Sequence, residues 1–319
     1  MGYIARRALT DMSCVICAAA DARLWCRAGA YDLYRCEHCG VVFTDPLPTQ
    51  RDVLRLYGAA SYFDGGGAGG YVTGYDVTAQ SQSLLYETIL DELGPPKLGA
   101  ILLEVGCAEG HFLAAARGRN WEVCGVEVSP IAAASARRRF GIHVIEGTLE
   151  EHHLEPTAYD VIVLLDVIEH LRDPMRVVRT AASLLKPDGR IVIKTPDIGS
   201  AQARRLGARW PHIKPPEHLV YFDVPSITFV LQACGFEIDK REAVGGTGVL
   251  VALRRLLGPN SVLDYSRSGY ALVAAKRWRW LAWLVAKISA AVGRQDGMIV
   301  FARRVPRYRT GAGVTTCGR

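Results

Sequence analysis

The middle of the chain alternates short apolar segments with segments of helical character, and this alternation constrains the fold more than any other feature. Expected strands lie at 100–105, 122–126, 143–146, 159–165 and 189–195, and two more lie at 235–243 and 298–303. The run from Val161 to Leu165 is apolar throughout, which is typical of a strand covered on both faces. The pattern predicts an α/β fold with a doubly wound, mainly parallel, seven-stranded sheet.

Nine cysteines are present, and four of them form two tight pairs near the N-terminus, Cys14 with Cys17 and Cys36 with Cys39. Each C-x2-C pair can occupy a turn that points two thiolates at one ion, and the separation of the pairs is typical of zinc sites. Four thiolates form a closed tetrahedral site, which indicates a structural Zn²⁺. We therefore predict an N-terminal zinc ribbon, because unligated cysteines would leave this short segment with too little core to fold.

These features divide the chain into a zinc ribbon at 1–48, a helical and loop-rich cap at 49–98, a core domain at 99–306 and a disordered tail at 307–319. Within the cap, Thr49 can begin a helix at 50–57, and a second helix is expected at 77–93. The glycine-rich segment 64–71 between them is either a loop that closes over a ligand or a plain linker.

A helical insert at about 249–292 precedes the last strand and carries Trp278, Trp280 and Trp283 among basic residues. Because charges interrupt its apolar run, the insert is not expected to span a bilayer. It can make peripheral membrane contact as a basic amphipathic helix, and packing on the domain, a dimer face and a lid are open alternatives. The N-terminus lacks the apolar run of a signal peptide, so we expect a cytoplasmic protein, monomeric or homodimeric, with membrane association only at the periphery.

The formal net charge of +6 comes from arginines scattered in short groups. This mild excess suits a phosphate-bearing small substrate or an anionic surface as well as nucleic acid. The interior of the predicted ribbon, at 21–35, lacks a dense basic stripe with interleaved aromatic residues. Nucleic acid is therefore not an expected partner.

The strongest chemical signal is a turn of small residues between a buried strand and a helix. Gly106 and Gly110 lie in this turn, where they let a ligand approach the backbone closely. Glu127 ends the next strand, where a carboxylate can accept both hydrogens of a ribose diol.

In these residues the chain resembles the class I S-adenosylmethionine-dependent methyltransferases, whose first motif, E/D-x-G-x-G-x-G, corresponds to 104–110. Ala108 replaces the second glycine, and this also separates the chain from the NAD fingerprint. Further motifs at 146–149 and 159–171 extend the resemblance, which implies a Rossmann-like fold and S-adenosylmethionine as cofactor. The implied cofactor site consists of Glu104, Gly106, Cys107, Ala108, Gly110, Phe112, Glu127, Val128, Thr148, Leu149, Asp166 and Val167.

The chain also resembles a subgroup in which a zinc ribbon precedes this fold and whose members methylate sugars and other metabolites. The shared features are a C-x2-C-G end of the ribbon, a D-P-x-P stretch at 45–48 and the segment 215–222. In that segment His218 is the expected general base for a hydroxyl acceptor, with Glu217 and Tyr221 as further catalytic candidates. A purely structural, hydrogen-bonded histidine is the alternative.

Asp166, Glu169 and His170 form a second candidate set after the fourth strand. Ubiquinone-pathway O-methyltransferases have a similar E-x-x-E-H arrangement that is associated with a divalent ion, so a Mg²⁺ site is conceivable here. We favour the simpler interpretation, in which Asp166 borders the methionine part of the cofactor and the other two residues shape the next helix.

Together these features predict transfer of a methyl group from S-adenosylmethionine to an oxygen of a small-molecule acceptor: a sugar, glycolipid, other glycoconjugate or nucleotide-sugar. Carbon methylation of a nucleotide-linked sugar is the first alternative, although the known carbon-methylating relatives usually carry an additional domain after the core. A nucleic-acid-binding or RNA-modifying protein is the second alternative.

Overall fold

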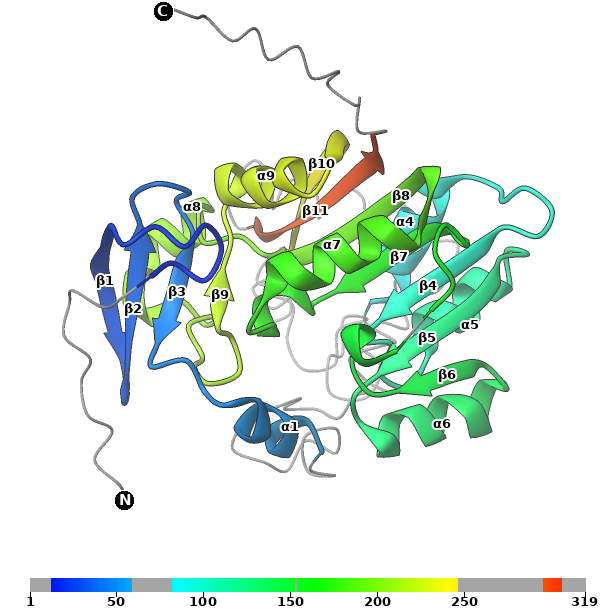
Figure 1. The fold of residues 1–319 in the computed structure, drawn as a ribbon, viewed down its shortest axis with the longest axis horizontal. Helices are drawn as coiled ribbons and strands as arrows, with labels where there is room; N and C mark the ends of the chain where they lie inside the picture. The colour runs from blue at the N-terminus through cyan, green and yellow to red at the C-terminus, as the bar shows by residue number, and fades with distance from the viewer. Residues whose placement is uncertain (1–12, 59–81, 153, 246–294, 306–319) are drawn as a thin grey trace, which may run out of the picture.

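The computed structural model describes residues 13–58, 82–152, 154–245 and 295–305, which form two sheets (Figure 1). The small sheet contains, in spatial order, β1 (Ala22–Ala28), β2 (Tyr31–Cys36), β3 (Val42–Asp45) and β9 (Val220–Tyr221). The large sheet contains, in spatial order, β10 (Phe236–Gly245), β11 (Gln295–Arg304), β8 (Leu185–Pro196), β7 (Tyr159–Leu165), β4 (Ile101–Val105), β5 (Glu122–Glu127) and β6 (His143–Glu146).

Five neighbouring strands of the large sheet are parallel, and at one edge the reversed strand β11 separates them from β10, which runs in their direction. Strands β8, β7, β4, β5 and β6 pair in parallel, whereas β11 pairs antiparallel with both β8 and β10. In β7 the side chains alternate between two cores, with Ile162 and Leu164 in one and Val161 and Val163 in the other. The apolar run predicted to be covered on both faces is therefore confirmed, as is the mainly parallel seven-stranded sheet.

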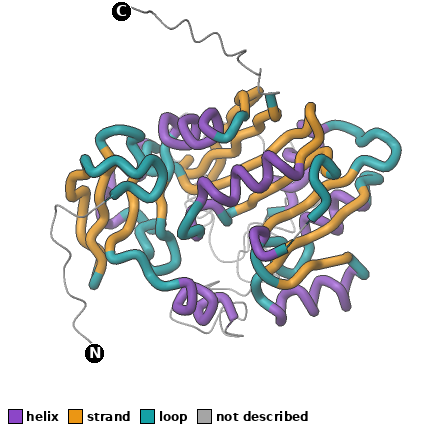
Figure 2. The backbone as a smooth tube through the Cα atoms, viewed as in Figure 1, coloured by secondary structure: helices purple, strands orange, loops and turns teal. Residues whose placement is uncertain are grey.

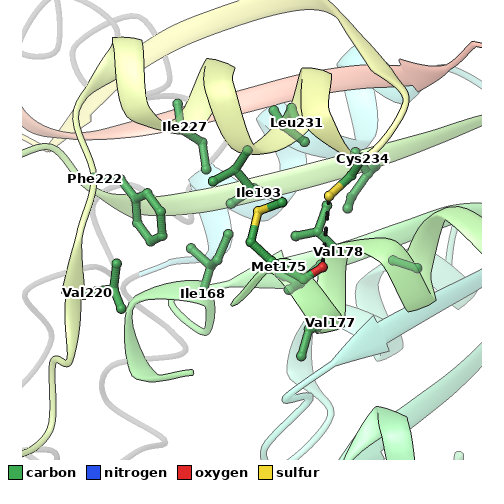
Figure 3. Close-up of a cluster of buried hydrophobic side chains, with 14 of the residues drawn as sticks. Ile168, Met175, Val177, Val178, Ile193, Val220, Phe222, Ile227, Leu231 and Cys234 are labelled. Carbon is green, nitrogen blue, oxygen red and sulfur yellow. Dashed lines mark hydrogen bonds between the residues drawn. The ribbon is translucent and has the colours of Figure 1, made fainter. Parts of the chain in front are cut away.

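Helices cover both faces of this sheet (Figure 2). The helices are α1 (Gln50–Gly58), α4 (Ser83–Leu93), α5 (His111–Arg117), α6 (Pro130–Phe140), α7 (Pro174–Leu184), α8 (Ala201–Leu206) and α9 (Val224–Ala233), with short 3-10 turns η2 (Leu149–Glu151), η3 (Ile168–His170) and η4 (Gly207–Arg209). Met175 of α7 and Ile227 and Leu231 of α9 pack in one core (Figure 3). Leu90 of α4 and Phe112 of α5 belong to the core on the other face.

The predicted helix at 50–57 is present as α1, and Thr49 caps it because its Oγ1 accepts a hydrogen bond from the Asp52 amide at 3.2 Å. The predicted helix at 77–93 is described only from Ser83 onward. The glycine-rich segment, the tryptophan-rich insert and the tail lie outside the described residues, so their predicted roles stay predictions. Among the helices that the structure describes, none is long and apolar enough to cross a membrane.

The small sheet joins the N-terminal segment to the core domain. Its first three strands belong to the predicted ribbon, but β9 comes from the segment just after His218. Strand β3 pairs antiparallel with it, with Val42 opposite Tyr221 and Phe43 opposite Val220. The predicted boundary at 48 therefore separates three strands from a fourth that completes their sheet.

Candidate functional site

The four paired cysteines meet at one point, as the sequence predicted. Their sulfur atoms all lie within 4.8 Å of one another, and Sγ–Sγ distances are 3.6 Å for Cys14–Cys39 and 3.5 Å for Cys17–Cys36. A tetrahedral zinc with Zn–S bonds of about 2.3 Å requires sulfur atoms roughly 3.8 Å apart. The cluster therefore has the size and the donor set of a closed structural zinc site.

A cavity of about 740 Å³ lies at the carboxyl ends of β4, β5, β7 and β8, which is where doubly wound folds bind ligands. Of the residues that the resemblance assigns to the cofactor, these line the cavity: Glu104, Gly106, Ala108, Glu127, Val128, Thr148, Leu149, Asp166 and Val167. His218 and Glu217 line it as well. One cavity thus brings together the predicted cofactor residues and the predicted base.

The loop after β4 needs its glycine at 106. Gly106 has a φ of +71°, and a Cβ added to it would lie 2.5 Å from Cγ2 of Val167. Glu127 holds the rest of the loop, since its Oε2 accepts a hydrogen bond from the Ala108 amide at 2.8 Å and its Oε1 accepts one from the Ser129 amide at 2.7 Å. Each carboxylate oxygen has a further lone pair, so Glu127 can still accept hydrogen bonds from a ligand diol.

Two buried carboxyl groups face this part of the cavity. Burial raises the pKa of Glu104 well above its ordinary value, and the charge of Glu127 raises it further. Oε2 of Glu104 is buried and has no hydrogen-bond partner within the described ranges. Burial also raises the pKa of Glu127, while the backbone hydrogen bonds oppose that shift. A buried carboxyl oxygen without a partner in the described ranges, beside a second carboxyl group, suits a ligand that brings hydrogen-bonding groups or positive charge.

Cys107, Gly110 and Phe112 do not line the cavity and instead support its loop from behind. Cys107 is buried so close to β5 that a Cβ added at Gly125 would lie 2.5 Å from its Sγ. Gly110 adopts a φ of +81° as it begins α5, and Phe112 packs edge-on against Tyr86 with ring centroids 5.4 Å apart. These three residues were predicted to bind the cofactor, but in the structure they pack behind the loop and do not line the cavity.

His218 lines the cavity from the segment just before β9. Its side chain is buried, and its Nδ1 has no hydrogen-bond partner in the part of the chain that is described. The ring packs at a right angle to His170, with centroids 4.8 Å apart, and stacks on His212 at 6.0 Å. Burial lowers the pKa of His218 well below its ordinary value, and the charges of His170 and Lys214 lower it further. At neutral pH His218 is therefore an uncharged imidazole.

His170 is held by the chain on either side of it. Its Nδ1 lies 2.8 Å from the Glu217 carbonyl oxygen and 2.7 Å from the Tyr57 hydroxyl. Because a carbonyl oxygen only accepts, we assign the proton in that bond to Nδ1. Burial lowers the pKa of His170 to about 4.

The second candidate set is rearranged in the structure. Glu169 and His170 lie within 4.8 Å of a ring nitrogen of His218, whereas Asp166 is ion-paired with Lys194. Burial and then the charge of Asp166 raise the pKa of Glu169 to about 8. One carboxyl and two imidazoles do not match the all-oxygen ligand set that Mg²⁺ prefers, so the residues present do not fit a Mg²⁺ site.

Glu217 and Tyr221 have different surroundings. Glu217 lines the cavity, and its carboxylate lies 3.7 Å from Nζ of Lys214. Tyr221 does not line the cavity but packs with Leu33 in the core of the small sheet, and its hydroxyl donates a hydrogen bond to the His218 carbonyl oxygen at 3.0 Å. The structure therefore places Tyr221 beside the backbone of His218.

Several cavity residues were missed by the sequence analysis, among them Tyr57, Lys194, His212 and Lys214. Lys194 had a signal, because it is a cation that follows the apolar run Ile191–Ile193 near the carboxyl end of a predicted strand. The other three come from α1 and from the segment before β9, which lie outside the central strands of the large sheet. No short sequence pattern predicts that these residues line the cavity.

Comparisons with known proteins agree with this geometry. A family profile described as "Methyltransferase domain" matches residues 78–241. A ubiquinone biosynthesis O-methyltransferase of Sodalis glossinidius is 29% identical over 150 residues, which is 39% of this chain and 59% of that protein. A probable S-adenosylmethionine-dependent methyltransferase of Mycobacterium tuberculosis is 33% identical over 113 residues, 35% of this chain and 41% of that protein. The chain thus spans about half the length of the curated relatives it matches.

Solved structures share the fold at low identity. Haemonchus contortus phosphoethanolamine N-methyltransferase 2, in complex with S-adenosyl-L-methionine, has a TM-score of 0.54 at 18% identity, over 83% of this chain and 62% of that one. The Streptomyces coelicolor geranyl diphosphate C-methyltransferase has a TM-score of 0.51 at 16% identity, over 82% of this chain and all of that one. These similarities establish the fold, and the acceptors named in them belong to those proteins.

Proposed function

Because this chain belongs to the class I S-adenosylmethionine-dependent methyltransferases, we propose that it transfers a methyl group from S-adenosylmethionine to a hydroxyl oxygen of a sugar or glycoconjugate. The cofactor supplies a sulfonium methyl group, which is already a strong electrophile. The chain must then hold the acceptor hydroxyl in line with that methyl group and receive its proton.

The cofactor occupies the β4–β5 side of the cavity in this proposal. The loop at Gly106 and Ala108 approaches it closely, and Glu127 accepts hydrogen bonds from the ribose. Thr148 and Leu149 border the adenine, and Asp166 and Val167 border the methionine portion. The orphaned Oε2 of Glu104 supports this placement, because the structure offers it no partner among the described residues.

His218 is the proposed general base, and the observation that carries the proposal is a buried, uncharged ring that lines the cavity and whose Nδ1 has no hydrogen-bond partner among the described residues. As the acceptor oxygen bonds to the methyl carbon, the carbon–sulfur bond breaks and S-adenosylhomocysteine leaves. The hydroxyl proton passes to a ring nitrogen of His218. Glu217 lies beside the base, where its carboxylate can accept a hydrogen bond from another acceptor hydroxyl.

A sugar acceptor is supported by the polar lining around His218. Glu169, Lys214 and Glu217 line the cavity together with His218. Carboxyl groups accept hydrogen bonds from hydroxyls, so this lining suits an acceptor with several hydroxyl groups, such as a sugar, glycolipid or nucleotide-sugar. The resemblance to ribbon-bearing sugar methyltransferases points the same way, and a structural zinc at the four cysteines is part of the same proposal.

A labelled-methyl assay tests this function. Zinc-loaded protein is incubated with S-adenosylmethionine carrying a radioactive methyl group and with UDP-glucose, methyl glucoside or a catechol. We expect label in a glucose-containing product, with a methoxy signal in its NMR spectrum. Label only in the catechol would indicate an aromatic acceptor and not a sugar. A methyl group attached to carbon would establish the alternative of carbon methylation. No transfer to either glucose compound contradicts the proposed acceptor class.

A further inference from the structure

The segment that carries His218 is anchored in the small sheet and in the core domain at once. On one side, Val220 and Tyr221 form β9, the last strand of the small sheet. On the other side, the Leu219 amide donates a hydrogen bond to the Glu169 carbonyl oxygen at 2.8 Å, and Phe222 enters the core between α7 and α9 (Figure 3). The backbone around His218 therefore bridges the cysteine-bearing sheet and the core domain.

Thr44 makes the closest connection from the cysteine-bearing side. Its side chain is 1% exposed, and its Oγ1 donates a hydrogen bond to the His218 carbonyl oxygen at 3.3 Å. Its amide donates another to the Leu219 carbonyl oxygen at 2.9 Å. The Tyr221 hydroxyl reaches the same His218 oxygen at 3.0 Å, so two buried hydroxyls meet on one carbonyl group.

The position of Thr44 depends in turn on the cysteine cluster. Thr44 pairs with Leu33 of β2, and β2 ends at Cys36. The turn at Cys36 is closed by its amide, which donates a hydrogen bond to the Val41 carbonyl oxygen at 2.9 Å, immediately before β3 begins. The turn at Cys36 therefore fixes the register of β3 on β2, and this register places Thr44.

We propose that Thr44 and Tyr221 are positioning residues for His218, and that the four-cysteine module is thereby a working part of the acceptor site. Both side chains hold the carbonyl group of His218, and this fixes the backbone from which the imidazole extends into the cavity. The inference rests on the proposed role of His218 as the base. It assigns Thr44, which does not itself line the cavity, a function in the reaction.

The test uses proteins labelled with ¹³C at histidine, saturated with S-adenosylhomocysteine. The His218 ring signal is identified by its absence in His218→Asn. We expect Thr44→Val and Tyr221→Phe each to shift or broaden this signal, and Thr44→Ser to restore it. The matched control is Thr228→Val, because the Thr228 hydroxyl donates to the Val224 carbonyl oxygen at 2.7 Å in α9 and lies away from the cavity lining.

Turnover with UDP-glucose or methyl glucoside gives a second readout. Thr44→Val should lower kcat about tenfold and leave the KM for S-adenosylmethionine and the affinity for S-adenosylhomocysteine unchanged. An unshifted His218 signal in both Thr44→Val and Tyr221→Phe overturns the inference, and so does an equal shift in Thr228→Val. If Thr44→Val does not fold, the His218 signal of Tyr221→Phe alone decides whether the inference holds. Turnover retained in His218→Ala would instead reject the base, and the NMR comparison does not depend on that outcome.

Discussion

The two sides of the cavity are built from the chain in different ways. The β4–β5 side comes from one strand, one turn and the end of the next strand, so its residues follow one another within 104–128. The His218 side is assembled from α1, η3, the segment 212–218 and, one layer behind, β3. Local geometry therefore fixes the first side, whereas the second depends on how two sheets are joined by β9.

The largest effect is expected from a substitution that alters only the His218 side of the cavity. His218→Ala should lower turnover of a glucose acceptor by about a hundredfold or more, since it removes the general base. Its affinity for S-adenosylhomocysteine should stay within about twofold of wild type, as this side does not hold the cofactor. His143→Ala, an exposed histidine on β6, is the matched control for kinetics and calorimetry. Full turnover in His218→Ala would show that another group accepts the proton.

The next largest effect is expected from a substitution that removes zinc from the cysteine module. Cys36→Ser should abolish binding of about one zinc per chain and lower Tm by roughly 5 °C or more, because metal binding contributes to folding. Cys26→Ser is the control, since Cys26 lies in β1 of the same module but outside the four-sulfur cluster. Metal analysis measures the zinc content, and thermal unfolding measures Tm. Equal zinc content in the two variants would mean that the cluster is not the metal site.

A smaller effect is expected on the β4–β5 side. Glu127→Gln should weaken binding of S-adenosylhomocysteine about tenfold, which corresponds to about 1.4 kcal/mol. The amide can no longer accept hydrogen bonds from both the Ala108 and Ser129 backbones and from the ribose. Glu122→Gln, exposed at the start of the same strand, should bind normally. Unchanged affinity in Glu127→Gln would show that the ribose lies elsewhere.

The mildest perturbation is pH. The pKa of His218 is lowered, so its protonation, which removes the base, occurs only at a pH below the ordinary histidine value of 6.5. We therefore expect kcat/KM for the acceptor to stay high as pH falls through 6.5 and to decline only in more acidic solution. An acid limb centred near 6.5 in the pH–rate profile would mean that the base is a solvated histidine.

The same contrast explains what the sequence could predict. The strand pattern, the 104–110 turn, Glu127 and the cysteine spacing are local, and all of them lie where the sequence placed them. Tyr221 was expected in the cavity because it lies near His218, but strand alternation in β9 turns it toward the small sheet. Pairing of β9 with β3 joins residues far apart in the chain, and no short pattern near Thr44 or His212 encodes it.

The most direct test of the account is a calorimetric titration of wild type, His218→Ala and Glu127→Gln with S-adenosylhomocysteine, on protein whose zinc content has been measured. The account predicts saturable binding to wild type and His218→Ala with nearly equal Kd, about tenfold weaker binding to Glu127→Gln, and about one zinc per chain in all three. Equal loss of binding in both variants, or no binding to the zinc-loaded wild type, would contradict the division of the cavity into a cofactor side and an acceptor side.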